Sequence, residues 1–172
     1  VVRRPPPESQ GVTVAIDGSP NSLKAVEVAL RIAEVLEEPV EVVSVFDPRF
    51  HIAAFKSISK VLSEEAGRVF RFDEQQKLHA EIIDKGLEKL YRGHLQTAAG
   101  LAEDAGHPVN TTLLAGKPFQ SVGEHVRRTK PSLLVLGRFG MHRAPDADIG
   151  NTCENLARLV RCSVLIVAGE LT

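Results

Sequence analysis

Three glycines with a fixed spacing are the residues of this chain best suited to bind phosphate. Gly137 and Gly140 enclose an Arg-Phe pair, and Gly150 follows after nine further residues. Glycine is needed where a backbone must approach a ligand closely or adopt a positive φ angle, and Gly140 and Gly150 would leave room for phosphate oxygens. An apolar run over 132–136 precedes the glycines, and a helix-length segment follows them. The N–H groups of such a loop and of the next helix can together hold an anion.

Polar residues close to these glycines could complete a nucleotide site. Asp17 ends an apolar run, and its carboxylate can accept a hydrogen bond from a ribose hydroxyl or from the adenine amino group. The N–H groups of Asn151 and Thr152 are expected at a helix N-terminus, where an anion gains up to about 1 kcal/mol from the helix dipole. Arg138 and Arg143 are near enough in the sequence to supply positive charge. These residue types together indicate a phosphate-bearing ligand.

Alternating apolar and amphipathic segments predict the elements that would position these groups. We expect strands at 12–16, 40–46, 108–115, 132–136 and 163–168. We expect helices from Pro20 to just before Pro39, at about 53–69, at 73–105, at 119–129 and at 151–160. This alternation predicts an α/β fold with a five-stranded parallel sheet, a Rossmann-like three-layer sandwich. Ligands of such sheets bind where the strand order reverses, and placing the first and fourth strands side by side brings Asp17 to the Gly137 loop.

The chain divides into a lead-in and one domain. Three consecutive prolines predict a flexible lead-in over 1–11, either a floppy terminus or a tether to a preceding or partner domain. Residues 12–172 suffice for one domain with a full core. We interpret about 47–72 as a helical insertion after the second strand. Within 73–105, Gly86, Gly93 and Gly100 could form a face for close helix packing. Alternatively, their spacing is due to chance, or the helix is interrupted near Gly93.

The motifs described above resemble those of the universal stress protein family. The first strand of that family ends in Asp-Gly-Ser, as Asp17-Gly18-Ser19 does in this chain. Its third strand is followed by Gly-x-Pro, as in Gly116-Lys117-Pro118. Its last motif is Gly-x-x-Gly, nine residues and Gly-Ser or Gly-Thr, and Gly137, Gly140 and Gly150 match this spacing.

The resemblance covers 12–46 and about 109–167, and it implies an adenine nucleotide α-hydrolase-like fold. One branch of the family binds ATP, and by position adenine would lie against Ala15, Asp17 and Val45. The ribose and phosphates would lie over Leu136, Gly137, Gly140, Gly150, Asn151 and Thr152. Members of the family are commonly homodimers, often paired through the last strand.

Two departures from the family pattern affect the ligand. Asn151 replaces the usual Ser or Thr; its amide can donate to phosphate but cannot ligate Mg²⁺ as a hydroxyl does. Asp146 and Asp148 would repel a triphosphate unless Mg²⁺ intervenes. The alternative is that both aspartates face solvent, and the presence of a metal site stays open.

The leading hypothesis is an adenine-nucleotide-binding protein, with ATP first and AMP or ADP next. It would act in a stress response or in regulation, with at most slow ATP hydrolysis, because neither a general base nor a pair of metal-binding carboxylates stands out. The alternative is a dimeric protein-interaction module of the same fold that has lost nucleotide binding.

Composition narrows the choice of function and location. The net charge of −1 gives no electrostatic case for a protein that binds nucleic acid or an anionic membrane. No apolar run approaches the length of a membrane span. Cys153 and Cys162 are expected on one helix, too far apart for a disulfide, and Cys153 is expected to be a buried packing residue. Free thiols fit the reducing cytoplasm.

Overall fold

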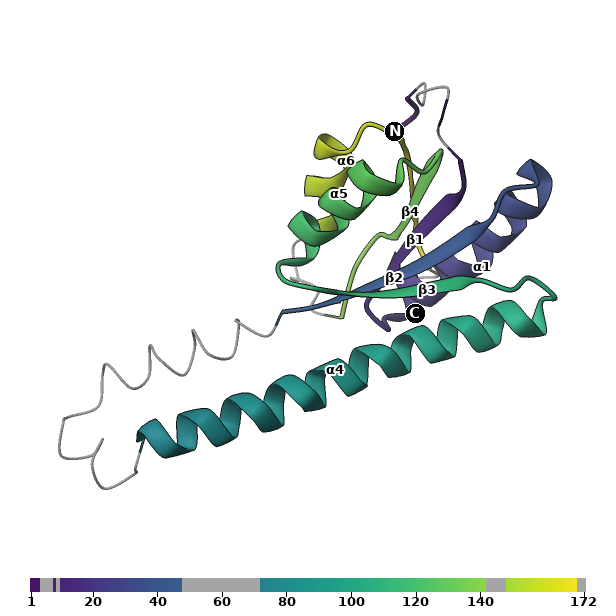
Figure 1. Cartoon of the computed structure of the whole chain (residues 1–172). Helices are drawn as coiled ribbons and strands as arrows, with labels where there is room; N and C mark the ends of the chain where they lie inside the picture. The colour runs from purple at the N-terminus through teal and green to yellow at the C-terminus, as the bar shows by residue number, and fades with distance from the viewer. Residues whose placement is uncertain (4–7, 9, 48–71, 142–147, 170–172) are drawn as a thin grey trace.

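The computed structural model describes residues 1–3, 8, 10–47, 72–141 and 148–169 (Figure 1). Some of the expectations fall outside these ranges. They are the helix at about 53–69, most of the 47–72 insertion, and the residues Arg143 and Asp146.

The fold is built on a five-stranded sheet in which all strands are parallel. The strands are β1 Val12–Ile16, β2 Val40–Phe46, β3 Asn110–Ala115, β4 Leu133–Gly137 and β5 Ser163–Val167. Their order is β3-β2-β1-β4-β5, so the chain builds one side of the sheet from β1 and then returns to build the other. The expected parallel α/β sheet is confirmed, and so is the pairing of the first and fourth strands.

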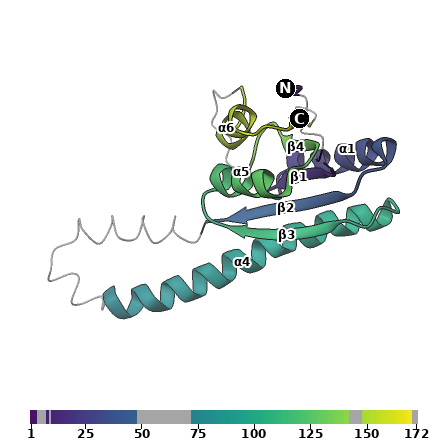
Figure 2. The same ribbon diagram turned by 45° about the horizontal axis from the view of Figure 1, so that its top comes forward.

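Helices cover both faces of this sheet. They are α1 Pro20–Leu36, α4 Phe72–Asp104, α5 Pro118–Thr129 and α6 Asn151–Leu159. The helices α1 and α4 lie on one face and α5 and α6 on the other, which gives three layers (Figures 1 and 2). Because strand side chains alternate, Val135 packs into the α1 and α4 core while Leu134 and Leu136 pack against α5 and α6. Within the described residues, no helix is long and apolar enough to cross a membrane.

The helix α4 is continuous over its 33 residues, and Gly93 does not interrupt it. At 1.5 Å per residue it is about 50 Å long, and its N-terminal end extends past the sheet in Figure 1. Methyl groups added at Gly86, Gly93 and Gly100 would meet nothing within 4 Å. In the described part of the chain, the spacing of these glycines therefore marks no close helix contact.

The edge strand β3 and the two cysteines can be compared with the expectations from the sequence. β3 forms one edge of the sheet, and none of its residues is fully buried, which fits the polar residues Asn110, Thr111 and Thr112 in its first half. Cys162 lies beyond α6, and the expectation of one shared helix is wrong because α6 ends at Leu159 and Val160 is already extended. Both thiols are free, as expected, and both are buried, which was expected for Cys153.

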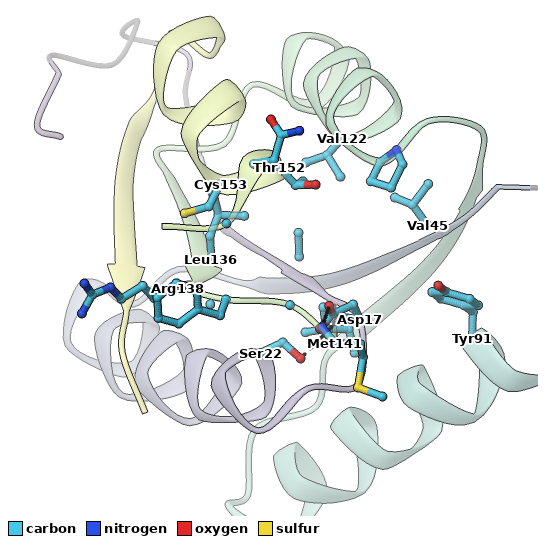
Figure 3. Close-up of a pocket in the computed structure, with 18 residues that line it drawn as sticks. Asp17, Ser22, Val45, Tyr91, Val122, Leu136, Arg138, Met141, Thr152 and Cys153 are labelled. Carbon is cyan, nitrogen blue, oxygen red and sulfur yellow. Dashed lines mark hydrogen bonds between the residues drawn. The ribbon is translucent and has the colours of Figure 1, made fainter. Parts of the chain in front are cut away.

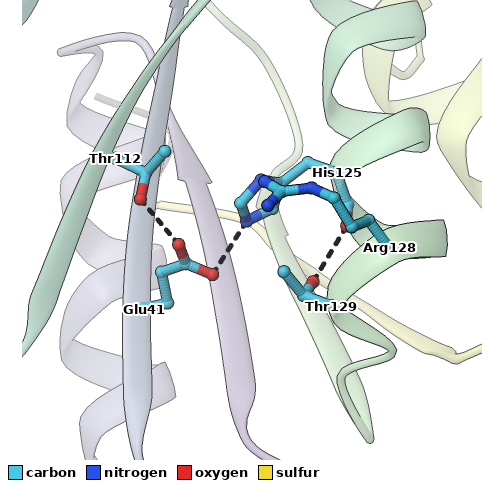
Figure 4. A network of polar contacts seen from close by, with 5 residues as sticks. All are labelled: Glu41, Thr112, His125, Arg128 and Thr129. Carbon is cyan, nitrogen blue, oxygen red and sulfur yellow. Dashed lines mark hydrogen bonds and ion pairs between the residues drawn. The ribbon is translucent and has the colours of Figure 1, made fainter.

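A partly buried polar network, centred on the buried His125, holds α5 against the sheet (Figure 4). The Nε2 of His125 lies 2.8 Å from Glu41 Oε2, and Thr112 Oγ1 donates to Glu41 Oε1 over 2.7 Å. Arg128 Nη2 lies 3.0 Å from the His125 Nδ1. Because a guanidinium can only donate, Nδ1 accepts from Arg128 and the imidazole proton is on Nε2, directed at Glu41.

Candidate functional site

A cavity of about 290 Å³ opens at the carboxyl ends of β1 and β4, where the strand order reverses. Parallel α/β sheets bind their ligands at this position. Its lining includes the expected site residues Ala15, Asp17, Val45, Leu136, Gly137, Arg138, Gly140, Gly150, Asn151 and Thr152 (Figure 3). Arg143, the remaining expected residue, lies outside the described residues.

The turn between β1 and α1 fixes the position of Asp17. Ser19 is the N-cap of α1, and its Oγ accepts a hydrogen bond from the Ser22 N–H over 3.2 Å. Pro20 follows within the first helical turn, where its fixed φ angle suits a helix. The Ser19 N–H donates to Asp17 Oδ1 over 3.1 Å, and Gly18 gives the turn its positive φ of 84°. The Asp-Gly-Ser-Pro sequence thus orients the carboxylate.

The Asp17 carboxylate is hydrogen-bonded to the loop between β4 and α6, which we call the glycine loop. The Met141 N–H donates to Asp17 Oδ2 over 2.8 Å, and Ser19 Oγ donates to the Phe139 carbonyl over 3.2 Å. A methyl group at Gly140 would overlap Asp17 Oδ2. Gly140 therefore makes room for this carboxylate, a role that the sequence did not indicate. Each carboxylate oxygen can accept a second hydrogen bond, so Asp17 can still bind a ligand.

The other two glycines allow close approach between backbones. A methyl group at Gly137 would lie 2.8 Å from the Ser22 nitrogen, at the start of α1. At Gly150 it would lie 3.2 Å from the Arg138 carbonyl oxygen, which already accepts the Gly150 N–H over 2.8 Å. Both glycines therefore hold the glycine loop close to its neighbours, and side chains at either position would push it outward.

The side chain of Arg138 holds the glycine loop through contacts with Asp148 and Phe139. Its Nε donates to the Asp148 carbonyl over 2.6 Å, and its guanidinium carbon lies 5.1 Å from the centre of the Phe139 ring. In Figure 3 the side chain points away from Asp17 and Tyr91. Asp148 is exposed and does not line the cavity, in agreement with the solvent-facing alternative.

The N-terminus of α6 borders the cavity with unpaired donors. Its N-cap, Gly150, has no side chain that could cap the helix. No described residue accepts a hydrogen bond from the N–H groups of Asn151 or Thr152. The Asn151 Oδ1 accepts from Asn155 Nδ2 over 2.6 Å, which leaves the Nδ2 group of Asn151 to donate. These donors and the helix dipole would together favour an anion at this position.

Tyr91 is a cavity residue that the sequence did not reveal. It belongs to α4 and lies on the side of Asp17 and Val45 (Figure 3). Burial raises the pKa of its hydroxyl, and the negative charge of Asp17 raises it further. Nothing in the sequence distinguishes a single tyrosine within a long amphipathic helix, so only the packing of α4 on the sheet could find it.

Two observations limit the chemistry of this cavity. Burial raises the pKa of the Cys153 thiol to about 11, so this thiol is protonated at neutral pH and is neither a base nor a ready nucleophile. Within the ranges that the structure describes, no three His, Cys, Asp or Glu residues come together as metal ligands would. The arrangement is that of a binding site with donors at one end and an acceptor at the other.

Comparison with protein families gives a match over nearly the whole chain. The model of the universal stress protein family matches residues 9–168. Among curated proteins, the chain is similar to universal stress protein MJ0531 of Methanocaldococcus jannaschii. The two are 24% identical over 161 residues, which are 91% of this chain and 80% of that protein.

Solved structures share the fold. A universal stress protein crystallised in complex with cAMP has a TM-score of 0.58 and 24% identity, and the match covers 92% of this chain and 95% of that one. The hypothetical protein MJ0577, whose structure served to assign its biochemical function, has a TM-score of 0.63 and 17% identity. That match covers 95% of this chain and 98% of the other.

Proposed function

The chain belongs to the universal stress protein family, and on that premise we propose that its cavity binds an adenine nucleotide, ATP first and AMP or ADP next. One observation carries the proposal. The unpaired N–H groups at the start of α6 and the Asp17 carboxylate border one cavity. A mononucleotide has the matching chemistry, because phosphate accepts hydrogen bonds and the ribose or adenine donates them.

Cavity size and a relative support this ligand class. A volume of about 290 Å³ is at the lower end of ligand pockets, which span about 300–1,000 Å³, and it suits one nucleotide better than a dinucleotide. One solved relative is a complex with cAMP, itself an adenine nucleotide. In our proposal Mg²⁺, where present, arrives with the triphosphate as its counter-ion.

The proposed role is to hold or sense the nucleotide, with at most slow ATP hydrolysis. The cavity's thiol is protonated at neutral pH, and Asp17 is engaged by two backbone N–H groups, so neither is a free general base. From the family resemblance we further propose a stress-response or regulatory function, a homodimer and a cytoplasmic location.

Calorimetry on the purified protein tests the nucleotide proposal. ATP, ADP and AMP are expected to bind, and the variant Asn151→Pro is expected to weaken ATP binding by about tenfold or more, the effect of losing one hydrogen bond to a charged group. Proline is tolerated at the first helical position, and it removes the backbone N–H together with the side-chain amide, so only the difference from an alanine variant reports the N–H. The matched control Asn151→Ala keeps that N–H and should lose less. Absence of binding heat with all three nucleotides would contradict the nucleotide-binding proposal.

A second candidate is a protein-interaction module that no longer binds nucleotide. The observation that favours it is the carboxylate of Asp17 beside Gly140, which brings negative charge to the glycine loop. Asn151 in place of Ser or Thr favours it too. Heat denaturation of the purified native protein discriminates the two candidates. A nucleotide released into the supernatant supports the first candidate alone.

A further inference from the structure

Tyr91 combines three properties that point to ligand contact. It is half-buried, it lines the cavity, and no described residue forms a hydrogen bond with its hydroxyl. Figure 3 shows the hydroxyl end of the ring directed toward the cavity, on the side of Asp17 and Val45. The hydroxyl is not among the buried polar atoms that lack a partner, so water can reach it in the free protein, and a bound ligand can take over that hydrogen bond.

Neighbouring residues hold the Tyr91 ring in this place. The His94 ring, one turn further along α4, meets it edge to face, with centroids 5.3 Å apart. The same His94 ring packs against the β1–α1 turn, since a methyl group at Gly18 would lie 2.5 Å from its Nε2. The position of Tyr91 is thereby tied to the turn that orients Asp17.

Tyr91 and the α6 N-terminus border different parts of the cavity. Figure 3 shows Thr152, at the start of α6, apart from Tyr91, which lies on the side of Asp17. The negative charge of Asp17 contributes to raising the pKa of the Tyr91 hydroxyl. If phosphate binds at α6, the nucleoside extends toward Asp17 and Tyr91. A tyrosine hydroxyl can both donate to and accept from a ribose or a base, and an aromatic ring can cover the face of a base.

We propose that Tyr91 binds the nucleoside end of the ligand, with its hydroxyl hydrogen-bonded to the ribose or the base and its ring closing that side of the cavity. This inference rests on the proposed nucleotide binding. It assigns recognition of the nucleoside to α4, a helix outside the motifs that gave the resemblance.

The tyrosine itself supplies the test. The chain has one tyrosine and no tryptophan, so its intrinsic emission reports Tyr91 alone. Adenosine is expected to change this emission, after correction against free tyrosine mixed with adenosine. Inorganic tripolyphosphate, which carries only the phosphate chemistry, should bind without changing it. The opposite pattern overturns the inference.

Ligand affinities measured by calorimetry give a second test of the role of Tyr91. The isosteric Tyr91→Phe variant should bind ATP about threefold to tenfold more weakly and tripolyphosphate as well as the wild type does, because one neutral hydrogen bond is lost at the nucleoside end only. The control Leu90→Ala, an exposed position on the same helix, should leave both affinities unchanged.

The two proposals fail in distinguishable ways. A wild-type protein that binds no adenine nucleotide overturns the proposed function and this inference with it. A wild-type protein that binds ATP, with Tyr91 emission unchanged and with Tyr91→Phe and Tyr91→Ala at wild-type affinity, overturns the role of Tyr91 alone. Thermal unfolding of each variant shows that a lost affinity does not come from a lost fold.

Discussion

Asp17 is the residue on which the candidate site depends most. Its two oxygens accept the N–H groups of Ser19 and Met141, so one carboxylate joins the β1–α1 turn to the glycine loop. The same carboxylate leaves no room for a side chain at Gly140. A substitution in this pair therefore changes the loop even in the absence of ligand.

We predict that Gly140→Ala destabilises the protein by about 1–3 kcal/mol, the usual cost of forcing extra atoms into a packed position. The added methyl would overlap Asp17 Oδ2 and separate the loop from the turn. The matched control is Gly86→Ala, where a methyl meets nothing within 4 Å and should stabilise the α4 helix by up to about 1 kcal/mol. Urea unfolding of both variants measures the difference, and equal shifts would contradict the packing described.

At the scale of elements, α5 is attached to the sheet by a polar network as well as by its apolar side chains. His125 of α5 is almost completely buried, with 2% of its side chain exposed, and its partner Glu41 of β2 is 24% exposed. A hydrogen bond to a buried donor such as the His125 Nε2–H is strongly favoured over leaving that donor unpaired.

We predict that Glu41→Ala lowers the free energy of unfolding by about 1–3 kcal/mol, because the His125 Nε2–H would be left buried without an acceptor. The control is Glu27→Ala, which removes an ion pair with Lys24 whose side chains are 44% and 50% exposed. Exposed pairs contribute about 0–1 kcal/mol, so this variant should stay close to the wild type. Chemical denaturation at neutral pH compares them, and a control as costly as Glu41→Ala would refute the argument.

Local sequence patterns predicted most of the helices and strands. The features that the sequence did not predict depend on how these elements pack together. The start of α1 could be predicted because Ser19 and Pro20 act within one turn of helix. The continuity of α4 through Gly93 could not, because burial of its C-terminal half against the sheet outweighs the propensity of one glycine. Tyr91 could not be assigned to the cavity either, since its place depends on how α4 crosses β2 and β3.

The sheet as a whole has two edges, and the chain covers one of them with its own residues. Val1 exchanges two backbone hydrogen bonds of 2.8 Å with Val164 of β5, an antiparallel pairing. Arg3 adds a bond from its Nη2 to the Ala157 carbonyl over 2.8 Å, and its own carbonyl accepts from Ser163 Oγ. An edge strand paired in this way is not free to pair with another sheet.

We predict that Arg3→Ala increases self-association, because weaker docking of residues 1–3 leaves the β5 edge open to a second copy. A dimer through the last strand, as proposed from the family, would have to displace these residues. Sedimentation velocity over a range of concentrations measures the effect, with Lys24→Ala on the distant α1 surface as the control. Identical self-association of Arg3→Ala and the control would show that residues 1–3 do not prevent the β5 edge from pairing with a second copy.

The contacts that join the β1–α1 segment to the second half of the chain also set the order in which the molecule can be completed. Ser19 bonds to Phe139, Asp17 to Met141 and Asn21 to Gly169, across 120, 124 and 148 positions. At synthesis rates of roughly 5–20 residues per second, a nascent β1 waits several seconds on the ribosome before β4 emerges beside it. The ligand cavity is thus among the last features of this domain to form, because it needs residues from both halves of the chain.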